Sequence, residues 1–407
     1  MHPGELFIKD FTYNLPDYRI AQYPLNPRDT SQLLVYKQGQ IESSQYKYLS
    51  NYLPANSLLV FNNSRVIEAR IFFRKETGGK IEIFALEPDD KELDITQAMG
   101  TEASIIYRCM VGGAAKWKPG IVLKKQVETT SQSFTLLAEN LGKVEDTYRI
   151  RFAWQPRHLH FAEVLHEAGE IPIPPYLQRQ TEAADAITYQ TIYARANGSV
   201  AAPTAGLHFT KTLLQDLENK KMGKSFLTLH VGAGTFLPVK TETISGHQMH
   251  AEFIEADEKL LRQLMEASTV IPVGTTSMRT LESLYWMGVK AYYQPYISLP
   301  ELEMKQWEVY EIWNQKSIPR NEALQALLHW LQKNKQQKLV TKTHIIIAPG
   351  YSFGICQGLI TNFHQPQSTL LLLVSALIGE NWREVYNYAL ENEYRFLSYG
   401  DGSLLLP

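Results

Sequence analysis

Residues 270–286 read VIPVGTTSMRTLESLYW, and this run joins a short strand to a helix through a small polar loop. Val270–Val273 is the predicted strand, 274–277 the loop and 278–286 the helix. The same order of strand, polar loop and helix recurs along the chain after residue 156. This alternation predicts an α/β fold, in which the loops that follow strand ends build the functional sites.

Further elements extend the pattern in both directions. Thr210 and Ser368 suit helix N-caps, and Ser368 precedes an apolar helix at Thr369–Ile378. The other strands that we predict around this pattern are 57–61, 225–231, 344–348 and 359–361.

Residues 68–155 differ, because short apolar segments alternate there with polar or Gly-containing breaks. Short strands at this spacing indicate a small antiparallel β-barrel. We therefore predict an inserted β-barrel domain at 68–155 within a large, barrel-like α/β domain made of 1–67 and 156–407.

The chain has 407 residues, with 40 Lys and Arg against 42 Asp and Glu, so its formal net charge is −2. This charge excludes a protein that is basic over its whole surface, but not local RNA-binding patches. The two cysteines, Cys109 and Cys356, are too few for a disulfide framework, a zinc ribbon or a three-cysteine iron–sulfur site. Without a signal-peptide pattern or a bilayer-spanning apolar run, we expect a cytoplasmic protein with no membrane contact.

Two loops combine polar groups with small residues. Asn62, Asn63 and Arg65 follow the first strand, where turn capping is the structural alternative to a binding role. In the segment 202–210, Thr204 and His208 stand among Pro, Ala and Gly, whose small size lets a ligand approach the backbone.

Three further loops carry histidines or anion-binding groups. His230 opens a Gly-rich loop that precedes a His-x-x-His-x-Glu run at 247–252, a spacing that fits metal ligands but also arises by chance. The loop 274–277 places N–H groups and hydroxyls at a helix start, which suits a carboxylate or phosphate. Arg279 belongs to that site or forms a surface pair with Glu282. The last loop holds Asn362 and His364.

Together these loops resemble one family, the S-adenosylmethionine:tRNA ribosyltransferase-isomerases of queuosine biosynthesis. The resemblance covers nearly the whole chain. It rests on the motifs at 23–31, 62–66, 78–82, 172–176, 201–209, 230–236, 249–252, 274–279, 359–364 and 399–401. It implies a large α/β domain with an inserted small β-barrel.

The resemblance also implies the chemistry. The ribosyl part of S-adenosylmethionine is transferred to 7-aminomethyl-7-deazaguanine at the tRNA wobble position and isomerised to an epoxycyclopentane, with release of adenine and methionine. S-adenosylmethionine is then a co-substrate rather than a prosthetic group. We expect no metal ion, the tRNA anticodon arm as the partner, and a monomeric enzyme. Histidines suit the proton transfers because their usual pKa lies near neutrality.

On this basis we assign the site. The predicted catalytic residues are His208, His230, His250, Glu252 and His364. The predicted substrate-binding residues are Arg28, Asp29, Asn62, Asn63, Arg65, Thr204, Ala205, Gly206, Gly232, Gly234, Thr235, Gly274, Thr275, Thr276, Ser277, Arg279, Asn362, Tyr399 and Asp401.

Basic residues cluster at 65–80, 116–125 and 333–342. A solvated surface is the common explanation of such runs, but three on a near-neutral chain favour phosphate contacts, and the insert is the predicted anticodon-arm contact.

The chain departs from the family pattern at Gln32, Gln357 and Gln365, where the family usually has Arg, Asp and Leu. The stretch 284–343 is an unusual insertion with a predicted extra helix near 321–333. These departures leave open a diverged, non-catalytic paralogue that binds S-adenosylmethionine or RNA. A metal-dependent hydrolase built on His247, His250 and Glu252 is a remote alternative.

Overall fold

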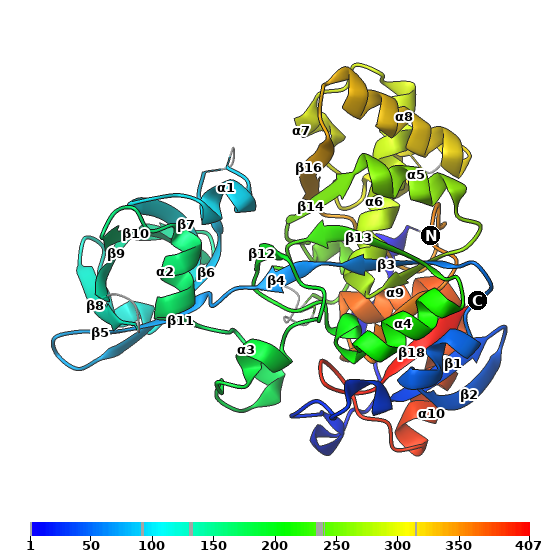
Figure 1. Cartoon of the computed structure of the whole chain (residues 1–407), viewed down its shortest axis with the longest axis horizontal. Helices are drawn as coiled ribbons and strands as arrows, with labels where there is room; N and C mark the ends of the chain where they lie inside the picture. The colour runs from blue at the N-terminus through cyan, green and yellow to red at the C-terminus, as the bar shows by residue number, and fades with distance from the viewer. Residues whose placement is uncertain (1, 91–92, 130–132, 233–238, 240, 314–315) are drawn as a thin grey trace.

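The computed structural model describes residues 2–90, 93–129, 133–232, 239, 241–313 and 316–407 (Figure 1). Within these residues a large α/β unit carries a smaller all-β unit at one side. The two units have separate hydrophobic cores. The expected α/β class with an inserted antiparallel β-sheet is confirmed.

The large sheet has nine strands in the described residues, in the order β16-β14-β13-β3-β15-β17-β18-β1-β2. Their bounds are β1 Gln32–Lys37, β2 Gln40–Gln45, β3 Leu58–Asn62, β13 Gly223–Leu229, β14 Glu252–Asp257, β15 Val270–Val273, β16 Lys338–Thr343, β17 Leu359–Asn362 and β18 Gly402–Leu406. The four neighbours β13, β3, β15 and β17 run parallel. Their carboxyl ends therefore meet at one edge of the sheet.

The smaller unit is a seven-stranded antiparallel sheet in the described residues, in the order β11-β5-β6-β7-β10-β9-β8. Its strands are β5 Arg70–Arg74, β6 Lys80–Pro88, β7 Ser104–Gly112, β8 Val122–Glu128, β9 Ser133–Val144, β10 Thr147–Gln155 and β11 Gly169–Glu170. The sheet curls until β5 lies against β8, which gives the barrel-like ring of Figure 1. A two-stranded pair, β4 Ser64–Val66 with β12 Ala196–Ser199, lies where this unit joins the larger one.

Helices cover both units. The α-helices are α1 Ile95–Met99, α2 Phe161–Ala168, α3 Asp185–Thr188, α4 Lys211–Asn219, α5 Glu258–Glu266, α6 Thr275–Tyr293, α7 Leu299–Leu302, α8 Arg320–Lys333, α9 Thr369–Ile378 and α10 Trp382–Glu391. Short 3₁₀ turns are η1 Pro3–Glu5, η2 Ile8–Asp10, η3 Asp17–Arg19, η4 Arg28–Thr30, η5 Tyr46–Asn51, η6 Ala114–Lys116, η7 Pro175–Leu177, η8 Thr204–His208, η10 Ile244–Gly246 and η13 Gly379–Asn381, and η11 Val309–Trp313 is a π-helical turn.

Helix α6 is buried on all sides from Thr275 to Ala291. Its charged side chains have partners inside the protein. Glu282 accepts hydrogen bonds from the N–H groups of residues 354–356 at 2.7–3.0 Å. Lys290 Nζ donates to Glu308 Oε2 at 2.8 Å and to two backbone carbonyls. The suggested surface pair between Arg279 and Glu282 is therefore wrong, because both side chains turn to separate buried partners.

Most predicted elements are present. The strand Val270–Val273, the helix near 321–333 and the N-caps Thr210 and Ser368 are confirmed. The predicted strand at 344–348 is wrong, since the strand in this region is β16, which ends at Thr343. Residues 345–348 are buried, but side chains form hydrogen bonds with backbone groups of this segment. Arg279 donates to the Ile345 carbonyl and Tyr310 to the Ile346 carbonyl.

The boundaries 1–67, 68–155 and 156–407, and the reading of 284–343 as an insertion, stay predictions. In the part of the chain that the structure describes, no helix combines the length and apolar character needed to cross a membrane.

Replacing Glu282 by Gln tests the role of α6. The amide offers one acceptor oxygen and turns an N–H₂ group towards backbone donors, so buried N–H groups lose their partner. We expect the free energy of unfolding to fall by about 2–4 kcal/mol in denaturant titrations. The exposed Glu266→Gln exchange on α5 is the matched control and should change stability by less than about 0.5 kcal/mol. Equal stability of the two variants would contradict this account.

Candidate functional site

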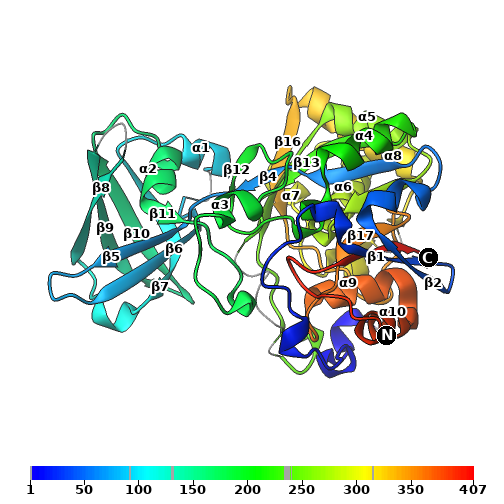
Figure 2. The ribbon, with the colours of Figure 1, turned by 60° about the horizontal axis from the view of Figure 1, so that its bottom comes forward.

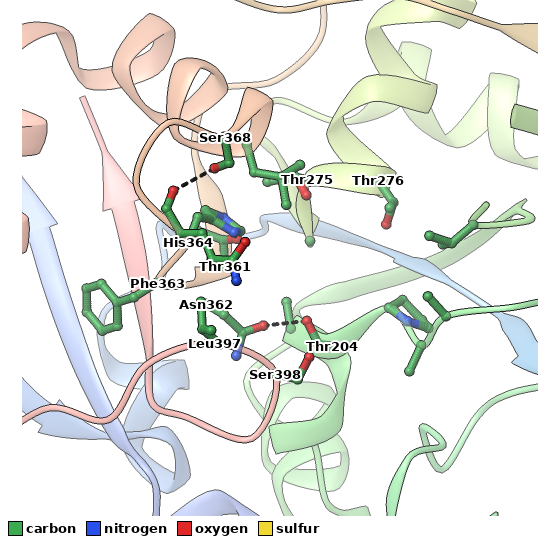
Figure 3. Close-up of a pocket in the computed structure, with 18 of the residues that line it drawn as sticks. Thr204, Thr275, Thr276, Thr361, Asn362, Phe363, His364, Ser368, Leu397 and Ser398 are labelled. Atoms are coloured by element: carbon green, nitrogen blue, oxygen red, sulfur yellow. Dashed lines mark hydrogen bonds between the residues drawn. The ribbon is translucent and has the colours of Figure 1, made fainter. Parts of the chain in front are cut away.

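A pocket opens where the parallel strands end, as expected for α/β sheets. It spans about 700 Å³, including space open to solvent, between η8, the start of α6 and the loop from β17 to α9 (Figure 3). The lining residues are Tyr176, Ala201, Ala202, Pro203, Thr204, Ala205, Val231, Gly274, Thr275, Thr276, Thr361, Asn362, Phe363, His364, Gln365, Ser368, Leu370, Leu397 and Ser398. The fold thus joins segments that the sequence places as much as 222 residues apart, from Tyr176 to Ser398.

The start of α6 supplies unused donors to this pocket. Gly274 is the N-cap with φ +93°, and no side chain caps the helix. The N–H groups of residues 275–277 therefore have no partner within the helix. Thr276 Oγ1 is buried with no hydrogen-bond partner in the described structure, whereas Ser277 Oγ donates to the Val273 carbonyl at 2.8 Å. This arrangement favours an anionic group of a ligand.

Asn362 lies on the opposite side of the pocket and is held from two directions. Thr204 Oγ1 donates to Asn362 Oδ1 at 2.9 Å, and the Asn362 amide donates to His208 Nε2 at 3.2 Å. The His208 ring stacks on Tyr46 with centroids 4.1 Å apart. Burial, aided by the charge of Arg395, lowers the pKa of His208 to about 3, so the ring is neutral and accepts this bond. His208 lies behind the lining residues and orients Asn362.

His364 belongs to the lining itself. Its Nε2 lies 2.9 Å from Thr361 Oγ1, and its backbone N–H donates to the Tyr386 hydroxyl at 3.1 Å. Nδ1 makes no hydrogen bond in the described part of the chain. Burial lowers the pKa of His364 to about 3, which keeps this ring neutral as well.

The backbone at Gly232, which follows β13, is held by a buried ion pair. Glu252 at the start of β14 binds Arg279 of α6, and its other oxygen accepts from the Gly232 N–H at 3.4 Å. His230 is buried, with Nε2 3.8 Å from Glu255 Oε1. The His230 and Lys338 side chains hold the pKa of Glu255 at about 2.

The His-x-x-His-x-Glu run does not form a cluster. His250 is exposed, whereas Glu252 is buried against Arg279. Among the described residues no three His, Cys, Asp or Glu side chains lie close enough to share a metal ion.

Several predicted binding residues lie outside the pocket lining and hold its walls. Asn62 bridges to the N–H and carbonyl of Leu229 at 3.1 and 2.9 Å. Asp401 accepts from the backbone of Gln32 and Arg395 at 2.9 and 2.7 Å. The remaining contacts are Asp29 with Thr210, Arg28 with the Thr188 and Gln190 carbonyls, Tyr399 with Asp185, and Asn63 with Thr228. Arg65 is exposed on β4, Gly206 is packed against Tyr193, and Gly234 and Thr235 lie outside the described residues.

Sequence reasoning missed Tyr176 and the pair Leu397–Ser398 as pocket residues. Tyr176 hydroxyl lies 2.6 Å from Ser398 Oγ. Leu397 has φ +69°, a left-handed conformation that is costly for a bulky residue and that often marks a functional site. The Pro-rich run before Tyr176 was the one available signal, since no polar pattern marks either segment.

Of the three glutamines that depart from the family pattern, one lines the pocket and two do not. Gln357 binds Val270, the first residue of β15, through its side chain and backbone at 2.7 and 3.0 Å. It therefore sits at the opposite end of the strand from the pocket, which begins after Val273. Gln365 lines the pocket, whereas Gln32 begins β1.

Known proteins were compared with the chain. A family model described as "Queuosine biosynthesis protein" matches residues 8–405. An S-adenosylmethionine:tRNA ribosyltransferase-isomerase from Nitrosococcus oceani is 36% identical over 405 residues, which cover 98% of each chain. One from Thermotoga petrophila is 35% identical over 406 residues, covering 98% of this chain and 99% of the relative. A crystal structure of the S-adenosylmethionine tRNA ribosyltransferase from Thermotoga maritima is 28% identical, with 98% and 100% coverage and a TM-score of 0.46.

The pH dependence of the free energy of unfolding tests whether the His364 ring is neutral in the folded protein. Between about pH 3 and 6.5 the unfolded chain binds a proton at this ring that the folded chain does not, so this group makes the free energy of unfolding rise with pH. Its contribution is complete above pH 6.5 and is lost as the pH falls. We expect His364→Gln to lower the slope between pH 5 and 6 by about 1 kcal/mol per pH unit. Exposed His329→Gln is the control, and an unchanged slope in His364→Gln would refute the neutral ring.

Proposed function

The chain belongs to the queuosine biosynthesis family of S-adenosylmethionine:tRNA ribosyltransferase-isomerases, and from this premise we propose which residues carry out the reaction. The enzyme transfers the ribosyl part of S-adenosylmethionine to the 7-aminomethyl-7-deazaguanine of tRNA and isomerises it to epoxyqueuosine. The pocket at the carboxyl ends of β13, β3, β15 and β17 is the proposed reaction site.

The start of α6 binds the methionine carboxylate in this proposal. The observation that carries the assignment is a buried helix N-terminus without a cap, next to the unpartnered hydroxyl of Thr276. Three backbone donors and the positive end of the helix dipole together stabilise one carboxylate.

His364 is the proposed acid–base group because it lines the pocket and its Nδ1 has no hydrogen-bond partner among the described residues. A neutral ring takes up the proton next to the sulfonium without repelling that cation. Asn362 positions the ribosyl part, and His208 acts through Asn362. Glu252 and Arg279 hold Gly232, and His230 and His250 stay predicted catalytic residues that are not among the lining residues.

Transfer RNA is the second substrate, and we propose that the insert binds its anticodon arm. Two of the predicted basic clusters meet on this unit, where Lys75 Nζ donates to the Lys116 carbonyl at 2.6 Å. We further propose that a single chain without a prosthetic group works in the cytoplasm, in keeping with two unpaired, buried cysteines.

Incubation with S-adenosylmethionine and tRNA carrying the deazaguanine precursor tests the proposal. We expect adenine release and a matching mass gain on the nucleoside. His364→Ala should lower turnover at least ~100-fold, as for loss of an acid–base group, while exposed His329→Ala keeps wild-type turnover. Binding of both substrates without product would support the non-catalytic paralogue.

A separate measurement tests the carboxylate site. Thr276→Val keeps the side-chain volume but removes the hydroxyl, so one hydrogen bond to a charged group is lost. We expect the KM for S-adenosylmethionine to rise about 10- to 100-fold, with a smaller change in kcat. Thr212→Val on the exposed side of α4 is the control. An unchanged KM in Thr276→Val would place the carboxylate elsewhere.

A further inference from the structure

The β5–β6 hairpin of the insert has a basic and aromatic outer face. Ile71, Phe73, Ile81 and Ile83 are buried in the insert core. Because side chains alternate along a strand, the intervening residues point the other way. The register pairs them as Arg70 with Phe84, Phe72 with Glu82, and Arg74 with Lys80. We call these six residues the hairpin strip.

Cations and rings contact each other along the hairpin strip. Lys80 Nζ lies 3.6 Å from the Phe72 ring centroid, and the Arg70 guanidinium carbon lies 5.7 Å from that of Phe84. Arg70 Nε also lies 3.0 Å from Glu82 Oε1, so this acid is neutralised. Arg74 and Lys80 make no ion pair in the described part of the chain. Two cations therefore remain available beside the half-buried Phe72 ring, whereas Phe84 is buried and belongs to the insert core.

The inner end of the hairpin strip opens into an apolar groove. This groove encloses about 1030 Å³ of space open to solvent, and Arg70, Glu82 and Phe84 of the hairpin strip line it. The other lining residues are Met110, Val111, Gly112, Asp146, Tyr148, Pro172, Ile173 and Pro175, so the lining is mostly apolar but also includes the carboxylate of Asp146.

The groove and the reaction pocket are lined by neighbouring residues of one segment. Pro175 lines the groove, and the next residue, Tyr176, lines the pocket. Consecutive Cα atoms are about 3.8 Å apart, so one short segment separates the two cavities. The strands β5 and β6 then run from this junction away from the larger unit (Figure 2).

From these contacts we propose that the groove and the hairpin strip bind the unpaired anticodon-loop nucleotides next to the modified nucleotide. This inference rests on the proposed function, which places the wobble nucleotide in the pocket. Unpaired RNA bases stack on aromatic and guanidinium planes, and cations beside the rings contact the phosphates. The groove takes the neighbouring base, while Phe72, Arg74 and Lys80 bind the following nucleotide.

Steady-state kinetics and a fluorescent RNA test the inference on the full chain. The probe is a synthetic anticodon stem-loop with 2-aminopurine beside the wobble position. We expect stacking to quench its fluorescence with the wild type. Phe72→Ala should weaken binding about 5- to 100-fold and raise the tRNA KM to match, with kcat at saturating tRNA unchanged within about twofold. Phe72→Leu keeps apolar volume without a π face, and it should behave like Phe72→Ala.

The salt dependence of RNA binding tests whether Arg74 and Lys80 contact phosphates. Arg74→Ala and Lys80→Ala should each lower the slope of log Kd against log salt by about 0.7, as for one lost phosphate contact to a single strand. Exposed Lys259→Ala on α5 is the matched control and should keep the wild-type slope.

The results distinguish a failure of the proposed function from a failure of the anticodon-loop binding alone. If the wild type forms no product, the proposed function fails. If the wild type turns over while the Phe72, Arg74 and Lys80 variants match Lys259→Ala in affinity and KM, the inference alone is overturned. A loss of affinity confined to Lys124→Ala in the 116–125 cluster would also overturn it. Calorimetric binding of S-adenosylmethionine should be unchanged in every hairpin strip variant, which shows that the pocket is intact.

Discussion

The burial of α6 is the constraint on which the rest of the large unit depends. A helix surrounded by protein cannot leave Arg279, Glu282 or Lys290 to water, so each charge needs a partner from another segment. Those partners are Glu252 at the edge of the sheet, the backbone of 354–356, and Glu308 with nearby carbonyls. The helix thereby holds three separate parts of the chain in place. The first turn of the helix faces the pocket, so the donors there remain available to a ligand.

Electrostatic neutrality is the second property of the pocket. Its described lining residues include no carboxylate, lysine or arginine. The two histidines nearest to it are kept neutral by burial, and the Glu252 charge is matched by Arg279. In the proposed binding mode, a ligand that carries both a carboxylate and a sulfonium meets a helix N-terminus for its anion and neutral acceptors for its cation. The two charges would then be accommodated without a fixed counter-ion in the described lining.

The segment 172–176 links the groove of the insert to the pocket of the large unit. It leaves β11 of the insert, passes the groove and reaches the pocket at Tyr176. Its prolines limit its conformational freedom, so the spacing between groove and pocket is restrained. A nucleic acid that spans both units would therefore have its reacting nucleotide positioned by the contacts of its neighbours. Without those neighbouring contacts, only the contacts inside the pocket would position the reacting nucleotide.

Local patterns in the sequence were enough to predict the strand at 270–273, the caps Thr210 and Ser368, the antiparallel insert and the family. These features depend on residues a few positions apart or on motifs in a fixed order. The pocket's loops were also predictable, since they follow parallel strands. The tertiary structure alone decided the side-chain partners. Arg279 takes Glu252, 27 residues away, over Glu282 at helical spacing, Gln357 sits far from the pocket, and 344–348 forms no strand. The reason is physical: periodicity reports which side of an element is apolar, whereas the order of strands determines which distant charges and backbone groups meet.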